Sequence, residues 1–450
     1  FLGGHPQALT PNMDRLAARG VVFANAHCAA PACNPSRAAV FSGLMPARSG
    51  VWSNGSGSID KHAPEAMLLP GALQEAGYRT FGTGKLLHKG GKSVFDEYHE
   101  VSQRWSPLPK EKVEYTKEEL ASKGTDDPRH VVEHMGETYV LPLNRMPSDR
   151  RPDERDGESH DWGAWDVPDS EFGDTQVTDW AIERLERGKK KPFFLGVGYY
   201  RPHIPLWAPA RFFDRFKDEP AELPPVRADD LDDLSETGKR WALEAKTAGS
   251  HETVVRFDQW RQAVEAYLAC VTYVDYEIGR LLDALDASRY ADNTVIVMWS
   301  DHGWHLGEKE HWGKWTGWER STRVPLVVAP PRAKAREFAP GGSRCDQPVG
   351  LIDLYPTLVE WCGVEGVGDL DGESLLPLMR EPGRVTGRKL VTWFDEGNAS
   401  VRSDRWRYLR YADGSEELYD MLEDPNEWEN LAGDEKFSAV KEAMGGVIID

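Results

Sequence analysis

Cys33, Pro35, Ser36 and Arg37 stand within five consecutive residues and could act together in nucleophilic chemistry. Ser36 is a candidate N-cap for an apolar helix expected over residues 38–44. Cys33 would then lie beside a helix N-terminus, where free N–H groups and the helix dipole favour an anion. Two interpretations follow from this placement. Cys33 is either a reactive group that Arg37 supports or a buried structural thiol.

A lysine and a histidine, Lys85 and His88, follow a strand expected over residues 78–82. Side chains at the carboxyl ends of parallel strands gather at one edge of a sheet. Lys85 would there neutralise an oxygen of a bound anion, and His88 would exchange a proton with a nucleophile. As surface residues they would do neither, and the local sequence does not separate these two interpretations.

A second histidine-bearing segment, Arg201-Pro202-His203, follows a strand expected over residues 193–199. The prolines around His203 fix the loop and present the imidazole. Because the ordinary pKa of histidine lies near neutrality, His203 suits general acid work on a leaving alcohol. The alternative is a histidine packed in a turn.

Asp301 and His302 come directly after a strand expected over residues 294–299, and Lys314 follows in the next loop. The aspartate supplies hard oxygen ligation for calcium, for which a neutral imidazole is a less usual partner. The same loop contains Trp304, Trp312 and Trp315. Aromatic faces in a loop can stack on sugars, but tryptophans also anchor loops, and we weigh the two roles equally.

Together these motifs resemble the signature of the type I sulfatases, and they occur in that family's chain order. The matching positions are residues 33–37, Lys85 with His88, Arg201-Pro202-His203, and Asp301-His302 with Lys314. The spacing of Lys85 and His88, together with Arg-Pro-His and Asp-His, is most similar to the iduronate-2-sulfatase-like branch.

The resemblance implies that a maturation enzyme oxidises Cys33 to formylglycine, an aldehyde. The hydrated aldehyde carries two hydroxyls on one carbon. One attacks sulfur, and the other, once deprotonated, expels sulfate by carbon–oxygen cleavage. A serine could perform the attack but not that elimination.

The resemblance also implies a role for each matching side chain. Cys33 is the nucleophile precursor and a contact of a bound calcium ion, and Arg37 supports it. Asp301 and His302 ligate the metal, Lys85 and Lys314 hold sulfate oxygens, His88 handles the nucleophile's proton, and His203 serves the leaving group. Candidates for substrate contact are Arg201, Trp304, Trp312 and Trp315.

The elements that would position these residues alternate between strand and helix, which predicts an α/β fold. Strands are expected over 21–23 and at the positions given above, and helices over 13–19, 71–76, 174–187 and 257–285. The resemblance implies an alkaline-phosphatase-like α/β/α sandwich with a mostly parallel central sheet and a small C-terminal α+β subdomain.

We expect the catalytic domain to span residues 1–384 and the C-terminal subdomain residues 385–450. Residues 96–173 are polar, with few periodic stretches, and predict an irregular insertion that shapes the substrate pocket.

The composition limits the possible functions. A chain of 450 residues with 40% hydrophobic content can form a large core and a smaller lobe. A net charge of −20 argues against a broad face for nucleic acid and favours a local pocket for one sulfated residue. No apolar run predicts a membrane span. The five cysteines do not make a disulfide framework, though one pair is possible.

Resembling sulfatases carry a buried strand that ends in paired aspartates, two further metal ligands, shortly before the segment Thr10-Pro11-Asn12. This sequence begins without them and without a secretory signal, so we expect its native N-terminus to lie further upstream. A protein truly lacking the pair should bind calcium weakly and turn over poorly. A periplasmic or secreted location is expected because polymeric sulfated glycans lie outside the cell.

The sequence therefore predicts a calcium-dependent sulfuric ester hydrolase that acts on a sulfated sugar, at an exposed end of a glycan. One rival is a phosphonate or phosphate monoester hydrolase on the same scaffold. The other is an inactive glycan-binding homologue, which requires that the paired aspartates be absent in nature.

Overall fold

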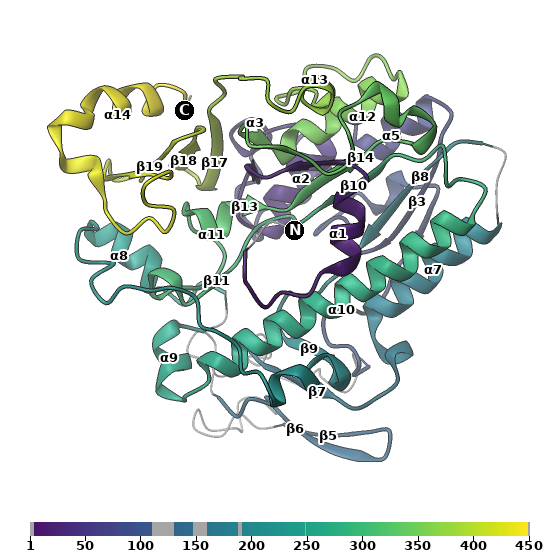
Figure 1. Cartoon of the computed structure of the whole chain (residues 1–450), viewed down its shortest axis with the longest axis horizontal. Helices are drawn as coiled ribbons and strands as arrows, with labels where there is room; N and C mark the ends of the chain where they lie inside the picture. The colour runs from purple at the N-terminus through teal and green to yellow at the C-terminus, as the bar shows by residue number, and fades with distance from the viewer. Residues whose placement is uncertain (1–3, 110–129, 147–159, 188–190, 248, 449–450) are drawn as a thin grey trace.

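Two neighbouring sheets form the centre of the chain (Figure 1). The computed structural model describes residues 4–109, 130–146, 160–187, 191–247 and 249–448. The sheets have the orders β4-β3-β8 and β10-β14-β1-β15. Their strands are β1 (Val21–Phe23), β3 (Arg79–Gly84), β4 (Glu97–His99), β8 (Phe193–Gly198), β10 (Ile296–Trp299), β14 (Leu326–Ala329) and β15 (Ser343–Cys345).

Most neighbouring strands in these sheets run in the same direction. β3 pairs in parallel with β4 and with β8, and β1 pairs in parallel with β15. β14 is antiparallel to both β1 and β10, so β10 has the direction of β1. The predicted, mostly parallel sheet is confirmed.

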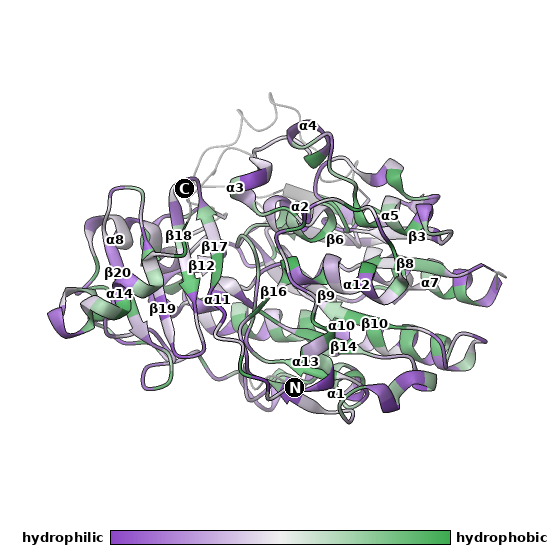
Figure 2. Ribbon diagram, turned by 90° about the horizontal axis from the view of Figure 1, so that it is seen from above, coloured by the Kyte–Doolittle hydropathy of each residue, from purple (hydrophilic) through white to green (hydrophobic). Residues whose placement is uncertain are grey.

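Helices cover both faces of the sheets (Figure 1). One layer contains α1 (Pro11–Ala17), α7 (Gly173–Arg187) and α10 (Trp260–Ala287), and the other contains α2 (Cys33–Ser42), α5 (Leu69–Glu75) and α12 (Leu354–Cys362). The long α10 buries apolar side chains three or four residues apart, such as Val264 and Leu268. The strands β8, β10 and β14 consist largely of hydrophobic residues, which are green in Figure 2. This arrangement is the predicted α/β/α sandwich.

The expected strands and helices are present, and their ends differ by at most three residues except for the helix expected over 38–44, which is α2 and begins five residues earlier. The four expected strands are β1, β3, β8 and β10, and the other four expected helices are α1, α5, α7 and α10. The smaller end shifts are ordinary because terminal helix turns and strand ends are weakly specified.

The two central sheets do not pair with each other across the edges of β8 and β10. A cavity of about 680 Å³ lies between these strands, lined by apolar residues such as Leu195, Val297 and Ile278. It extends to Asp301 and His302 at the carboxyl ends of the strands. The facing edges present backbone N–H and C=O groups that another strand could pair with.

The prediction that residues 96–173 are irregular is wrong for the part that the structure describes. β4 joins the central sheet, β5 (His130–His134) and β6 (Glu137–Leu141) form a hairpin, and β7 (Trp162–Trp165) pairs in parallel with β9 (Leu206–Pro209). Three tryptophans of this segment, Trp105, Trp162 and Trp165, are buried in one core cluster. The strands are short, so their alternation is weak in the sequence. Residues 110–129 and 147–159 lie outside the described residues.

A separate four-stranded sheet lies at the C-terminal end of the chain. Its antiparallel strands, in order, are β17 (Leu390–Asp395), β18 (Asn398–Arg402), β19 (Trp406–Arg410) and β20 (Glu416–Asp420), and α14 (Ser438–Gly445) packs against it. This is the predicted small α+β unit. The remaining helices and strands are α3 (Pro46–Ser49), α4 (Ile59–His62), α8 (Glu236–Leu243), α9 (His251–Arg256), α11 (Glu319–Thr322), α13 (Leu376–Arg380), β11 (His305–Leu306), β12 (Trp312–Gly313), and the sheet β13 (Arg323–Val324), β2 (Ala26–His27) and β16 (Val349–Gly350).

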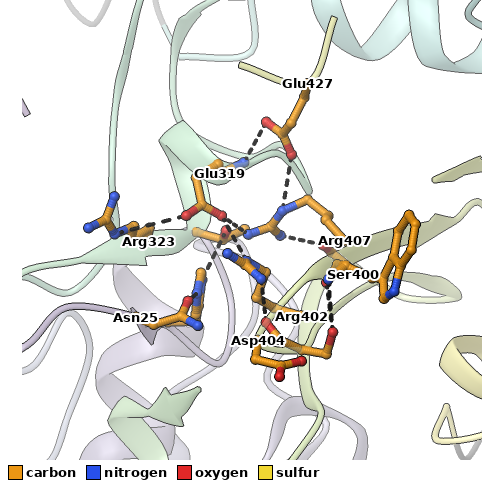
Figure 3. Close-up of polar contacts among 12 residues, drawn as sticks. Asn25, Glu319, Arg323, Ser400, Arg402, Asp404, Arg407 and Glu427 are labelled. Carbon is orange, nitrogen blue, oxygen red and sulfur yellow. Dashed lines mark hydrogen bonds and ion pairs between the residues drawn. The ribbon is translucent and has the colours of Figure 1, made fainter. Parts of the chain in front are cut away.

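A buried charge cluster joins the C-terminal sheet to α11 (Figure 3). The Glu319 carboxylate accepts hydrogen bonds from Arg407 and from Arg402, the latter at 3.4 Å. Glu427 pairs with Arg407 at 3.0 Å and accepts the Glu319 backbone N–H at 2.9 Å. Because α11 follows the loop that carries Lys314, this cluster fixes one end of that loop.

The cluster makes stability depend on pH through Glu427. Burial raises the pKa of Glu427 to about 7, although Arg407 opposes that rise. The folded state therefore binds this proton more tightly than the unfolded chain does, where a glutamate titrates near ~4.3. The stabilisation is complete at acid pH and is lost as the pH rises through about 7. We expect the free energy of unfolding of Glu427→Gln to fall less than that of the wild type between about pH 5 and about pH 8.

Urea unfolding of both proteins at the two pH values measures this difference, with the exposed Glu429→Gln as the control. Parallel changes in the wild type and Glu427→Gln would contradict the assignment.

Candidate active site

Cys33 is the first residue of α2, and Ala32 is its N-cap in an extended conformation. The prediction that Ser36 caps this helix is therefore wrong. Pro35 lies in the first turn, where backbone N–H groups have no intrahelical partner and a proline costs little. The helix thus begins before Pro35, and Ser36 donates its hydroxyl to the Asp301 carbonyl at 2.5 Å.

The Cys33 sulfur is buried, and the groups around it include two lysines and a histidine. Lys314 Nζ lies 2.9 Å from Sγ, His302 Nε2 at 3.3 Å and Lys85 Nζ at 3.6 Å. Burial alone would raise the pKa of the Cys33 thiol, but Lys314 and Lys85 more than offset it and hold the pKa well below its usual range. The site therefore stabilises negative charge at the position of Sγ. The five cysteines are all free thiols, so the possible disulfide is not formed.

Asp301 places a second charge beside this position. Burial would raise the pKa of Asp301, but Arg37 and His302 offset that and lower it to about 2. Arg37 donates from Nε to Asp301 Oδ2 at 2.8 Å and also to the carbonyls of Lys85 and Leu86. Arg37 thus ties α2 to the loops after β3 and β10.

Among the described residues, Cys33, Asp301 and His302 form the group that could hold a metal ion, with ligand atoms within 4.8 Å of one another. His302 donates Nδ1–H to the Gly303 carbonyl at 2.9 Å, and this bond orients the ring so that Nε2 faces Cys33. Calcium takes roughly six to eight oxygen ligands. One carboxylate and an oxygen at residue 33 supply only part of that number, so these residues fit one side of a calcium site.

His203 contacts the same cluster from the loop after β8. Its Nδ1 donates to the Ile204 carbonyl at 2.7 Å, and its Nε2 lies 3.3 Å from Lys314 Nζ. Burial, followed by Lys85 and Lys314, holds the pKa of His203 well below its ordinary value. In the absence of substrate, His203 is therefore neutral and accepts a hydrogen bond from Lys314.

His88 lies at the outer edge of the site. His88 as a whole residue is exposed, but its ring is partly buried, and this burial lowers the pKa of His88. The nearby Cys33 opposes that shift. Burial likewise lowers the pKa of Lys85, against an opposing effect of Cys33.

The four predicted substrate contacts differ in their surroundings. Trp304 lines the cavity, and its ring centroid lies 6.2 Å from that of His203. Trp312 is buried and donates to His251, and the Arg201 guanidinium bonds to backbone carbonyls, including that of Trp207 at 2.7 Å. Trp315 is half-buried and packs against a core cluster. These contacts favour Trp304 as a substrate contact and give the other three residues packing partners, and all four roles stay predictions.

Sequence analysis missed Tyr200, whose ring centroid lies 4.6 Å from Lys85 Nζ and which lines the cavity. Its position between β8 and Arg201 was the available signal, because that strand end carries His203. Asp301, as the partner of Arg37, had no local signal, since the two are distant in the chain.

Comparison with known proteins agrees with this geometry. The sulfatase family model matches residues 2–364, and the model described as "N-sulphoglucosamine sulphohydrolase, C-terminal" matches residues 307–449. A sulfatase of Formosa agariphila is 36% identical over 98% of this chain and 81% of its own length. Human iduronate 2-sulfatase is 30% identical over 79% of this chain and 65% of its own length.

Among solved structures, the phosphonate monoester hydrolase of Agrobacterium radiobacter superposes with a TM-score of 0.74 at 22% identity, over 98% of this chain and 90% of that one. This likeness supports the alkaline-phosphatase-like fold. The chain belongs to the sulfatase family and is a hydrolase of sulfate esters. No helix in the described part of the chain is long and apolar enough to cross a membrane.

Proposed function

We propose that this sulfatase removes sulfate from a sulfated sugar or glycan end, with residue 33 as formylglycine and with a bound calcium ion. The observation that carries the proposal is the enclosure of Cys33 Sγ by Lys314, Lys85 and His302. The similarity to human iduronate 2-sulfatase and the position of Trp304 in the cavity wall support a sugar substrate.

Each side chain has a task that its surroundings allow. Lys85 and Lys314 bind the nonbridging oxygens of the sulfate ester and stabilise the charge that develops on them. Arg37 holds Asp301 in place and ionised. His88, at the exposed edge, passes the nucleophile's proton to solvent.

Formylglycine would supply a hydrated aldehyde, which can attack sulfur with one hydroxyl and release sulfate through the other. Formation of formylglycine requires a maturation enzyme as a partner. Polymeric sulfated glycans lie outside the cell, so an enzyme that acts on them requires a periplasmic or secreted location. Calcium would supply positive charge beside residue 33.

The remaining calcium ligands come, in this proposal, from acidic residues at the carboxyl end of a strand that pairs with β8 and β10. Three observations support it. The facing edges of these strands are not paired with each other, the apolar cavity between them is large, and the cavity reaches Asp301. An apolar ligand could fill the space but could not pair with the backbone groups of both edges.

The second candidate is a phosphate or phosphonate monoester hydrolase, which the fold of the Agrobacterium enzyme favours. The test is turnover of matched 4-nitrophenyl sulfate and phosphate by protein made together with a formylglycine-generating enzyme. We expect kcat/KM for the sulfate to exceed that for the phosphate by at least about tenfold. The reverse order would favour the second candidate, and binding of sulfated glycans without turnover would favour the inactive homologue.

Conversion of Cys33 to formylglycine replaces a thiol by an aldehyde. Intact-mass analysis of the same protein should therefore show a loss of about 18 Da. Cys33→Ala should lose both the mass change and turnover. Full activity in Cys33→Ala would refute the assignment of the nucleophile.

His203 is neutral in the resting site, but a bound sulfate ester brings negative charge to Lys85, Lys314 and the imidazole. That charge favours the protonated form of His203, which can then donate to the leaving oxygen. We expect His203→Ala to slow hydrolysis of an alkyl sulfate at least about tenfold more than that of a nitrophenyl sulfate, whose leaving group needs no proton. Equal losses on both substrates would remove His203 as the acid.

A further inference from the structure

His311 lies in the loop before Lys314 and is almost completely buried, with 1% of its surface exposed. Its Nδ1 is 2.8 Å from the carbonyl oxygen of Ala242, and its Nε2 is 2.9 Å from the carbonyl oxygen of Lys314. Both partners are hydrogen-bond acceptors. A neutral imidazole has one N–H donor, whereas the imidazolium has two. Only the protonated ring can therefore satisfy both contacts.

Two histidines near Cys33, His302 and His203, differ from His311 in this respect. His302 and His203 each use Nδ1–H on one carbonyl, and their Nε2 atoms face Cys33 and Lys314, not a second carbonyl. The neutral ring suits His203, whose Nε2 can accept from Lys314, and His302 Nε2 faces a sulfur that donates as a thiol or accepts as a thiolate. His311 is thus a buried ring whose neutral form leaves two lone pairs facing each other at hydrogen-bond distance.

We propose that His311 is a positioning residue for Lys314 and that its imidazolium form locks the Lys314 backbone, so that the anion site is best ordered at acid pH. This inference rests on the proposed role of Lys314 in holding sulfate. The link is short, because the Lys314 carbonyl bonds to His311 while its Nζ lies 2.9 Å from Cys33 Sγ.

Some groups around His311 favour its protonated form and others oppose it. Ala242 lies in the last turn of α8, and the free carbonyls at a helix C-terminus favour a cation. Burial opposes the cation and lowers the pKa of His311, with a further contribution from Lys246, while Glu244 raises it. The other groups that face the ring are His305 on β11, whose centroid lies 5.2 Å away, and His251 on α9.

This balance determines how the order of the Lys314 backbone changes with pH. As the pH falls below the ordinary range of histidine titration, His311 gains its second proton and its second hydrogen bond. As the pH rises, one contact becomes repulsive and the Lys314 backbone loosens. The interaction lost is about one hydrogen bond. We therefore expect kcat/KM to fall roughly fivefold when His311 is fully deprotonated.

The first experiment needs no turnover. Protein with 15N-labelled histidine is titrated with acid, and the His311 ring signals are assigned by their absence in His311→Gln. We expect both ring nitrogens to be protonated at acid pH and, after correction for intrinsic rates, greater protection of the amides of 311–316 from hydrogen exchange. A ring that stays neutral to the acid limit of folding, or protection that does not change with its protonation, would overturn the proposal.

The second experiment compares kcat/KM against pH for the matured wild type, His311→Gln and the exposed control His62→Gln. Glutamine does not titrate, so His311→Gln should lack the change in kcat/KM that follows the His311 titration, whereas His62→Gln keeps it. An unchanged profile in His311→Gln would contradict the inference. If turnover is absent but the ring and exchange results appear as expected, the proposed function fails and the positioning role stands.

Discussion

The structure depends on one interaction, the contact of two lysines and a histidine with a buried anion position at residue 33. Lys314, Lys85 and His302 reach this position from three separate strand ends or loops, and none of them is near Cys33 in the chain. Bringing two lysines together in a buried site is unfavourable unless negative charge lies between them. The thiolate supplies that charge here, and in the proposed reaction the sulfate ester does.

The fold provides the rigidity that this arrangement requires. Parallel strands place their carboxyl ends at one edge, so the loops after β3, β8 and β10 meet beside the first turn of α2. Arg37 and Asp301 tie α2 to two of those loops. The Lys314 loop is held separately, by His311 at one side and by the Glu319 cluster of the C-terminal sheet at the other. The small sheet thus supports the site without contributing a residue to it.

Much of this was predictable from the sequence because strand ends and motifs are local signals. Lys85, His203 and Asp301 each follow a periodic apolar stretch, which located them at one sheet edge. Contacts between distant segments had no such signal. The bond from Arg37 to Asp301, and the placement of His311 between α8 and Lys314, depend on how the elements pack. The start of α2 differs from the prediction because serine is a favoured N-cap residue, whereas in the structure Ala32 takes that position and Pro35 is tolerated in the first helical turn.

The central claim is that residue 33 occupies a position held electropositive by Lys314 and Lys85. It is tested most directly by titrating the ultraviolet absorbance of the thiolate in unprocessed protein, with Cys33→Ser subtracted as the blank. The account predicts that Cys33 ionises far below an ordinary thiol and that Lys314→Met raises its pKa, whereas the exposed Lys61→Met does not. A Cys33 that titrates like a free cysteine, or that ignores the loss of Lys314, would contradict it.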